Sequence, residues 1–288
     1  MVQLVRGERP LINQSENAKK KIEAKSISFG YEKAEILKEI NLDVKAGEFL
    51  VLMGPSGCGK STFLRLLAGL ETPTKGEILI DGVSSTVSIP DCGVVFQDYS
   101  LFPWLSAEDN IALAIKQKLK EKKKKKEIRQ IADEYLQLVQ LGHAIGKYPG
   151  QMSGGMKQRA AIARALAFGS ELLLMDEPFG ALDPVTRSNL QDLLLQISRD
   201  QNRTIVFVTH DVDEAIYLAD RIVIFTLGTE GAITTSIDVP FQKPRNRKKL
   251  FEKNEFSNFR ENVFNIMNQG LLKNMEKKET MDSFGDGI

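Results

Sequence analysis

Cysteine, tryptophan and histidine are scarce in this sequence, and neither sign of charge is in excess. Its 288 residues include 2 cysteines, 1 tryptophan and 2 histidines, and 39 lysines and arginines stand against 38 aspartates and glutamates. Two cysteines without CxxC spacing exclude a small disulfide-stapled protein and favour a reducing, cytosolic compartment. A formal net charge of +1 gives no overall field for nucleic acid, so any basic patch must be local.

Long hydrophobic runs are missing as well. Apolar segments such as 49–53 and 172–175 are far shorter than the roughly 18 residues that a helix needs to cross a bilayer. The beginning of the chain lacks the charged, apolar and cleavage regions of a signal peptide. We therefore expect a chain that does not itself span a membrane.

Short strand signals dominate the first third of the chain. Residues 1–23 are polar and are predicted to form a tail, with structure beginning near Ala24. A helix is predicted at 62–70. Around it, β-rich runs separated by turn-forming residues predict strands at 27–29, 40–44, 49–53, 78–80 and 94–96.

The remaining sequence changes character twice. Helical periodicity without a convincing strand from 107 to 168 predicts a helical subdomain over about 98–168. Residues 241–288 are basic and then polar, and predict a helical extension. Between these parts, strand and helix signals alternate, which predicts an α/β fold with a mostly parallel core sheet. The strands are expected at 172–175, 205–208 and 222–225, and the helices near 185–199 and 212–219.

Residues 54–62 have the phosphate-loop pattern of glycine, four residues, glycine, lysine and serine. The segment follows the apolar strand 49–53 and opens a helix, so its backbone N–H groups can surround phosphate oxygens. Lys60 is expected at the β and γ phosphates, and the Ser61 hydroxyl on Mg²⁺. The alternative is a glycine turn entering a helix. The predicted nucleotide contacts are Gly54, Ser56, Gly57, Cys58, Gly59, Lys60, Ser61 and Thr62.

A second apolar strand, 172–175, is followed by Asp176 and Glu177. Ligands of parallel sheets bind beyond the carboxyl ends of the strands, where these two acids are expected. Asp176 is predicted to bind Mg²⁺ directly or through water, and Glu177 to polarise an attacking water at the γ-phosphate. The alternative is an ordinary strand end followed by the turn 178–180. Together with the phosphate loop, the acids predict a nucleoside triphosphatase.

A third motif, Ser153-Gly154-Gly155, stands at the start of a predicted helix. Ser153 is a good N-cap residue, and the two glycines expose backbone amides as a second anion-binding nest. In this setting the motif resembles the signature of ABC ATPases. The resemblance covers about residues 24–240. It implies an ABC-type P-loop ATPase with a mostly parallel core sheet, an antiparallel β-subdomain and an inserted α-helical subdomain.

The same resemblance implies roles for further residues. Tyr31 matches the aromatic that stacks on adenine, although it could be a core residue, with Phe29 as the rival for adenine. Gln97 matches the glutamine between the subdomains and is expected to contact the metal and to act in catalysis, unless it only caps a strand. Asp183 matches a residue of the loop after the catalytic acid and is expected to contact the nucleotide. His210 matches the switch histidine at the γ-phosphate, where a lone histidine would otherwise be structural.

Two segments narrow the resemblance to a branch of the family. Met152 and Met156 depart from the commonest signature, but 153–159 together with Leu-Phe-Pro-Trp-Leu at 101–105 looks like the nitrate, sulfonate and taurine importers, including related thiamine-precursor importers. In that branch the segment after the glutamine helps to form a groove for a permease helix. Phe102-Pro103-Trp104 would suit such a groove, or could equally pack within the helical subdomain.

The resemblance implies an ATP- and Mg²⁺-dependent subunit that energises a separate integral membrane permease. An extracytoplasmic solute-binding protein would be an indirect partner. Two copies are expected to meet head to tail, so that Ser153 and Gly155 of one complete the γ-phosphate site of the other. The cargo would be a small anion or vitamin precursor, the location peripheral at the cytoplasmic face of the membrane, and nucleic acid no partner. The alternative is a soluble ABC-like ATPase of an assembly pathway, such as an iron–sulfur scaffold.

Three local features lead to separate expectations. The lysine run 122–126 predicts a solvated helical face or loop, with anionic lipid headgroups as the alternative. Cys58 should favour its thiolate because it lies beside a helix N-terminus and Lys60. Asp211 and Glu214 have the spacing of a capping box for the helix that follows them.

Overall fold

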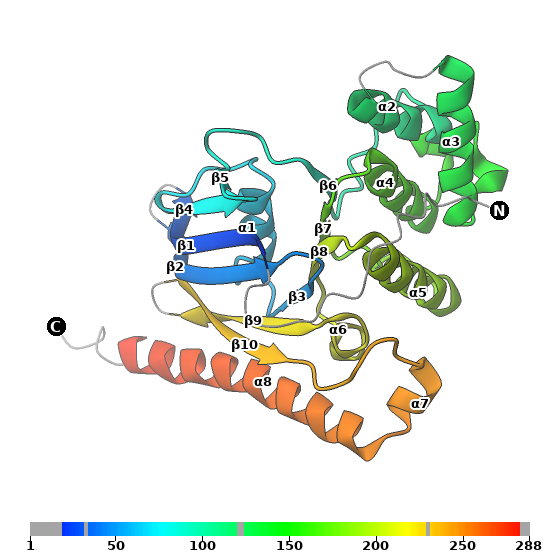
Figure 1. Cartoon of the computed structure of the whole chain (residues 1–288). Helices are drawn as coiled ribbons and strands as arrows, with labels where there is room; N and C mark the ends of the chain where they lie inside the picture. The colour runs from blue at the N-terminus through cyan, green and yellow to red at the C-terminus, as the bar shows by residue number, and fades with distance from the viewer. Residues whose placement is uncertain (1–18, 32–33, 120–123, 229–230, 283–288) are drawn as a thin grey trace.

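The described strands form one ten-stranded sheet, in the order β5-β4-β1-β2-β10-β9-β3-β8-β7-β6 (Figure 1). The computed structural model describes residues 19–31, 34–119, 124–228 and 231–282. Most of the predicted tail, together with Lys122 and Lys123 of the lysine run, therefore lies outside the described residues. The α/β class predicted from the sequence is confirmed.

Five neighbouring strands form the parallel half of the sheet. β3, β7 and β8 are buried at every position, which explains why their sequences are nearly continuous apolar runs rather than alternating ones. This half is the predicted parallel core. Its strands are β9 (Arg221–Gly228), β3 (Phe49–Met53), β8 (Thr204–Val208), β7 (Leu172–Asp176) and β6 (Cys92–Val95).

The other end of the sheet is antiparallel, as the resemblance implied. β1 begins at Lys20, so the predicted start at Ala24 was too late. The lysines at the start of β1 weaken its apolar pattern in the sequence. In the structure, however, Ile22 is fully buried and pairs with Val44 and Ile80. The strands are β1 (Lys20–Tyr31), β2 (Ala34–Lys45), β4 (Lys75–Ile80) and β5 (Val83–Ser84).

Strand β10 (Gly231–Asp238) was not predicted. It pairs antiparallel with β9 over its whole length and contacts β2, so it joins the two halves of the sheet. Four of the five residues from 233 to 237 are β-branched and favour a strand. They follow the predicted strand 222–225 so closely that a second strand was not recognised.

Three helices form the predicted helical subdomain beyond β6 and β7 (Figure 1). They are α2 (Ala107–Leu119), α3 (Lys125–Leu138) and α4 (Gly154–Phe168), and they pack against one another. Lys124, Lys125 and Lys126 are exposed at the start of α3. This exposure agrees with a solvated face for the described part of the lysine run.

The remaining helices cover the sheet. α8 runs along β9 and β10 (Figure 1) and buries Phe256 and Val263. Within the described ranges no helix combines the length and apolar character needed to cross a membrane. These helices are α1 (Lys60–Leu67), α5 (Pro184–Gln201), α6 (Val212–Leu218), α7 (Arg247–Phe251) and α8 (Asn254–Asp282).

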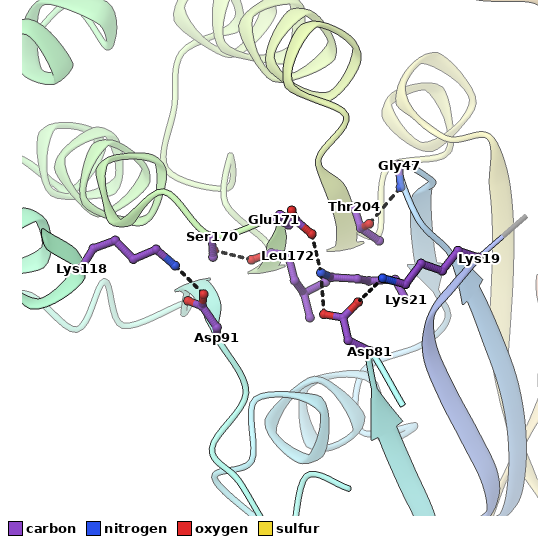
Figure 2. Close-up of polar contacts among 10 residues, drawn as sticks. All are labelled: Lys19, Lys21, Gly47, Asp81, Asp91, Lys118, Ser170, Glu171, Leu172 and Thr204. Atoms are coloured by element: carbon purple, nitrogen blue, oxygen red, sulfur yellow. Dashed lines mark hydrogen bonds and ion pairs between the residues drawn. The ribbon is translucent and has the colours of Figure 1, made fainter. Parts of the chain in front are cut away.

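Ion pairs join the parts of the molecule at the amino ends of the parallel strands (Figure 2). Lys21 of β1 is buried, and its Nζ lies 2.7 Å from Asp81 Oδ2 and 2.9 Å from Glu171 Oε2, just before β7. Lys118 near the end of α2 pairs with Asp91, which precedes β6. These contacts tie the antiparallel strands and the helical subdomain to the edge of the sheet opposite the strands' carboxyl ends.

Asn110 of α2 organises the segment that enters the helical subdomain. Its side chain is fully buried, and Oδ1 accepts a hydrogen bond from Phe102 N at 2.9 Å. Its Nδ2 lies 3.2, 3.1 and 3.0 Å from the carbonyl oxygens of Phe102, Leu105 and Ser106. The side-chain amide of Asn110 therefore hydrogen-bonds to four backbone groups of an irregular turn.

Replacement of this amide should destabilise the fold. We expect Asn110→Ala to lower the free energy of unfolding by about 2–3 kcal/mol, because buried backbone groups lose their partner. Urea denaturation followed by circular dichroism measures the change. Asn189→Ala, at an exposed position of α5, is the matched control and should keep the wild-type midpoint. Equal midpoints for the two variants would contradict the role of Asn110.

Candidate active site

Candidate residues from distant parts of the sequence lie beyond the carboxyl ends of adjacent strands. Gly54 follows β3, Glu177 follows β7, and His210 comes shortly after β8. Because β3, β8 and β7 are hydrogen-bonded neighbours in parallel register, their carboxyl ends meet at one edge of the sheet. Gln97, shortly after β6, extends this row by one strand.

Left-handed backbone shapes the phosphate loop between β3 and α1. The φ angle is +140° at Gly54, +80° at Gly57 and +95° at Gly59. A Cβ at Gly54 would lie 2.2 Å from the Phe225 carbonyl oxygen, and a Cβ at Gly59 would lie 2.6 Å from Leu37 Cδ2. Gly54 and Gly59 are therefore required both by conformation and by space, whereas at Gly57, where a Cβ would meet no neighbour, only the conformation favours glycine.

Lys60 is the first residue of α1, and its side chain is buried against the phosphate loop. Its Nζ donates hydrogen bonds to the carbonyl oxygens of Gly54 and Pro55, each at 2.8 Å. The ammonium group is thus already held at the mouth of the loop. Ser56 is exposed nearby, and Thr62 is half-buried in the first turn of α1.

One open pocket of about 500 Å³ is lined by all three predicted metal-binding residues, Ser61, Gln97 and Asp176. Burial raises the pKa of the Asp176 carboxyl, and a hydrogen bond from Ser61 opposes this shift. A nearby cation would stabilise the charged form of such a buried carboxylate. A hydroxyl, an amide oxygen and a carboxylate are oxygen donors that suit Mg²⁺ and leave coordination positions for phosphate. The residues therefore fit a magnesium ion.

Glu177 and His210 lie side by side. Glu177 Oε1 is 3.5 Å from His210 Nδ1, and the imidazole side chain is 72% exposed. The backbone at Glu177 has a φ angle of +45°, and its N–H donates to the Val208 carbonyl at 3.0 Å. This uncommon conformation turns the chain sharply after β7.

The two candidate adenine-stacking residues have different environments. Phe29 is buried, whereas Tyr31 is 45% exposed at the end of β1 and donates a hydrogen bond to Glu71 Oε1 at 3.2 Å. Their rings meet edge to face with centroids 5.0 Å apart. Of the pair, Tyr31 therefore presents the accessible face, and Phe29 supports it from the core.

The signature segment opens α4 in the helical subdomain. Ser153 is the N-cap residue, as predicted, and its Oγ accepts a hydrogen bond from Met156 N at 3.3 Å. A Cβ at Gly155 would lie 3.0 Å from the Ala181 carbonyl oxygen. The segment is therefore packed against the loop that follows Glu177. Residues 153–155 do not line the pocket that contains Ser61, Gln97 and Asp176.

Asp183 serves as the N-cap of α5. Its Oδ1 accepts hydrogen bonds from Val185 N at 3.1 Å and Thr186 N at 3.0 Å. Hydrogen bonding to Thr186 lowers the pKa of the Asp183 carboxyl. In this conformation the residue fixes the start of α5 below the loop 180–183.

Some charged residues of this site were not predicted from the sequence. Arg65 and Glu71 line the same pocket as Asp176, and Glu71 also binds the Tyr31 hydroxyl. Arg65 lies four residues after Ser61 on α1, so helical spacing carried a signal for it. Glu71 had no such signal, because it lies after the end of α1.

Cys58 does not have the environment predicted for it. Its side chain is only 1% exposed and packs among core residues. Burial raises the pKa of the Cys58 thiol, and the charge of Lys60 only partly opposes this effect. Burial also raises the pKa of Cys92 to about 12. The expectation of a thiolate in the phosphate loop was therefore wrong, because desolvation outweighs the neighbouring positive charge.

Thiol labelling tests this correction. A raised pKa keeps the thiol protonated at neutral pH, so the folded protein should react slowly with Ellman's reagent. The rate should keep rising with pH beyond about 8.5, the ordinary cysteine pKa. Both thiols should react rapidly in urea. The Cys92→Ser variant isolates Cys58, and a labelling rate that levels off near neutral pH in that variant would show a lowered pKa.

Comparison with known proteins agrees with this geometry. The family model for ABC transporters matches residues 37–180, half of the chain. The chain is 51% identical over 233 residues to the bicarbonate transport ATP-binding protein CmpC of Synechococcus elongatus, covering 81% of this chain but 35% of the relative. It therefore spans about a third of the length of that relative.

A relative of similar length also matches. The nitrate transport protein NasD of Klebsiella oxytoca is 45% identical over 231 residues, which cover 80% of this chain and 88% of NasD. Among solved structures, a dimer of the ATP-binding cassette MJ0796 bound to ADP and Pi superposes with a TM-score of 0.70 at 33% identity, covering 77% of this chain and 100% of that one. The chain belongs to the ABC transporter family.

Proposed function

We propose that the chain is an ATP-binding and ATP-hydrolysing subunit that energises a separate membrane permease. The observation that carries the proposal is the meeting of the phosphate loop, the Asp176–Glu177 pair and His210 at one edge of the sheet. The solved relative with ADP and Pi supports the nucleotide assignment. Tyr31 would stack on adenine through its accessible face.

Each residue of the loop and pocket has a role in holding the nucleotide. The backbone N–H groups of 54–62 would surround the phosphates, and Lys60 would turn from its loop carbonyls to the β and γ oxygens. Ser61, Asp176 and Gln97 would hold Mg²⁺. When bound, the ion offsets negative charge on the phosphate oxygens.

Hydrolysis would depend on the Glu177–His210 pair. The Glu177 carboxylate orients a water molecule and accepts its proton as the water oxygen bonds to the γ-phosphorus and the bond to ADP breaks. His210, 3.5 Å from Glu177, would hold the carboxylate and donate a hydrogen bond to the γ-phosphate. Water and ATP thus give ADP and phosphate.

A second copy would complete each site. Ser153 and Gly155 lie in the helical subdomain, outside the pocket that contains Asp176, so one chain alone leaves the signature away from the phosphate loop. In a head-to-tail pair, Ser153 and the amides at 154–155 of one chain would cover the γ-phosphate of the other. The dimeric ABC cassettes among the solved relatives support this arrangement.

The names of the relatives suggest the cargo. They are transport proteins for bicarbonate and nitrate, which favours a small inorganic anion and disfavours the soluble assembly ATPase. We propose import through a permease, with an extracytoplasmic solute-binding protein delivering the anion. The chain would then lie at the cytoplasmic face of the membrane as a peripheral subunit.

A groove of about 350 Å³ between the core and the helical subdomain would receive the permease. Its lining includes Leu70 and Ile89 from the core and Phe102 and Leu113 from the segment 98–168. Trp104 stands beside Phe102 with ring centroids 5.5 Å apart and is 69% exposed. Such exposure argues against Trp104 as a packing residue of the helical subdomain and favours contact with a partner.

The proposed chemistry can be tested at Glu177. We expect Glu177→Gln to keep ATP affinity but lose turnover by about 10²- to 10⁴-fold, because the amide retains the shape of the acid and cannot accept the proton. With MgATP the variant should dimerise, as measured by light scattering after gel filtration. Lys60→Ala is the contrasting control and should lose nucleotide affinity together with activity. A Glu177→Gln protein that binds ATP and turns over at the wild-type rate would overturn the assignment.

The permease contact can be tested at Trp104. We expect Trp104→Ala to keep the ATPase rate and the melting temperature of the isolated chain, while weakening assembly with the permease by about 2 kcal/mol or more. Capture of detergent-solubilised permease at graded concentrations measures this loss. Phe264→Ala, another exposed aromatic, on α8, is the matched control and should not affect capture. Equal capture of the permease by the two variants would contradict the proposed contact with Trp104.

A further inference from the structure

A buried polar bridge connects the helix that follows Asp183 with the helix that follows His210. Gln191 of α5 and Glu214 of α6 are both almost completely buried, and Gln191 Nε2 lies 2.7 Å from Glu214 Oε1. The Thr209 hydroxyl also hydrogen-bonds to the Glu214 carboxylate. A hydrogen-bonded group of this kind fixes its members firmly, because breaking one bond leaves a polar group buried without a partner.

The local sequence does not account for this use of Glu214. A glutamate at this position usually bonds back to the N–H of the N-cap residue. Here Asp211 accepts a hydrogen bond from Glu214 N at 3.0 Å, but Asp211 N donates instead to Thr209 Oγ1 at 3.1 Å. The predicted capping box is thus only half formed, and the Glu214 carboxylate bonds to α5 instead.

Arg187 makes a second connection from the same face of α5, one turn before Gln191. Its Nη2 donates to the Leu182 carbonyl at 3.3 Å, and its Nη1 lies 3.9 Å from Asp211 Oδ2. The guanidinium group therefore reaches from the loop after Glu177 to the residue that follows His210. Arg187 thus joins α5 to the residue after His210, and Gln191 joins it to Glu214, which in turn bonds to Thr209 before His210.

The sheet fixes the preceding residues of the same loop. Thr209 N donates to the Leu52 carbonyl at 3.2 Å, and the Val208 carbonyl accepts from Glu177 N at 3.0 Å. The His210 imidazole itself is largely exposed. Its position against Glu177 consequently depends on the backbone that carries it.

We infer that Gln191 and Glu214, supported by Arg187, are positioning residues that hold His210 against Glu177. The inference rests on the proposed roles of His210 and Glu177 in ATP hydrolysis. The bridge lies behind the loop, with Glu214 buried among α5, α6 and Thr209, so it would act through the placement of His210. Misplacement of a reacting group by about 1 Å can slow a reaction by about 100-fold.

The first experiment breaks the bridge. We expect Gln191→Leu to lower kcat by about 10- to 100-fold with KM for ATP changed by no more than about twofold, because nucleotide contacts remain and only positioning is lost. Gln196→Leu makes the same replacement at an exposed position of α5 and should keep both parameters. If Gln191→Leu matches this control, the inference fails.

A swapped pair provides a rescue and a second set of variants should Gln191→Leu not fold. Gln191→Glu alone places two carboxylates face to face and should impair kcat. Combining it with Glu214→Gln restores one donor and one acceptor across the same gap, so most of the activity should return. A double variant no better than the single one would contradict the bridge.

Removal of His210 separates positioning from general stability. If the bridge acts through His210, Gln191→Leu should cause no further loss of kcat in a His210→Ala background. The same fold-loss in both backgrounds would show a structural role only. Melting temperatures of all variants are compared alongside, so that activity is expressed per folded molecule.

Nuclear magnetic resonance gives a readout that does not need activity. The chain has 2 histidines, so histidine-labelled protein should give one imidazole signal from His210 and a reference signal from His143. Gln191→Leu should move or broaden the His210 signal and leave that of His143 unchanged. An unchanged His210 signal refutes the bridge even if the proposed function holds. Conversely, normal turnover by Glu177→Gln would refute the proposed ATPase function, and the effect of Gln191→Leu on the His210 signal would still test the bridge.

Discussion

The parallel hydrogen bonding of β3, β8, β7 and β6 is the constraint on which the candidate site depends. Their registers bring Leu52, Val208 and Asp176 to the same edge, although these residues are far apart in the sequence. The chain leaves each of these strands at this edge, and the segment that follows each strand is polar. The arrangement of the candidate site therefore results from strand order, with no need for the polar segments to attract one another before the sheet forms.

Sharp turns and buried charge follow from that arrangement. Gly54 and Glu177 both adopt positive φ angles immediately after a strand, where the chain turns sharply out of the sheet. Lys60 and Asp176 are buried at these exits, where burial raises the pKa of Asp176 and Lys60 bonds to loop carbonyls. Such desolvated charges interact strongly with a phosphate and its cation, since little water screens them.

Buried polar contacts stabilise both edges of the same sheet, but the segments that they connect differ. At the amino ends of the strands, Lys21 ties β1 to Asp81 and Glu171 and serves the fold. At the carboxyl ends, Gln191 and Glu214 tie α5 to the loop that carries His210. A buried hydrogen bond has the same physical properties in both places. Its consequence depends on whether the connected segment is structural or carries an exposed reactive group.

The sequence alone determined the parallel core, the phosphate loop and the acid pair, because these depend on unbroken apolar runs and on residues fixed by local backbone geometry. It did not reveal strand β10, which follows β9 so closely in the sequence that the two strand signals were not separated, or the early start of β1, whose buried Ile22 is masked by lysines. Only the tertiary structure decided that Tyr31 is accessible while Phe29 is not, that Cys58 is desolvated, and that Glu214 bonds to Gln191. Burial and long-range pairing arise when distant segments pack together, and adjacent residues in a chain carry no record of them.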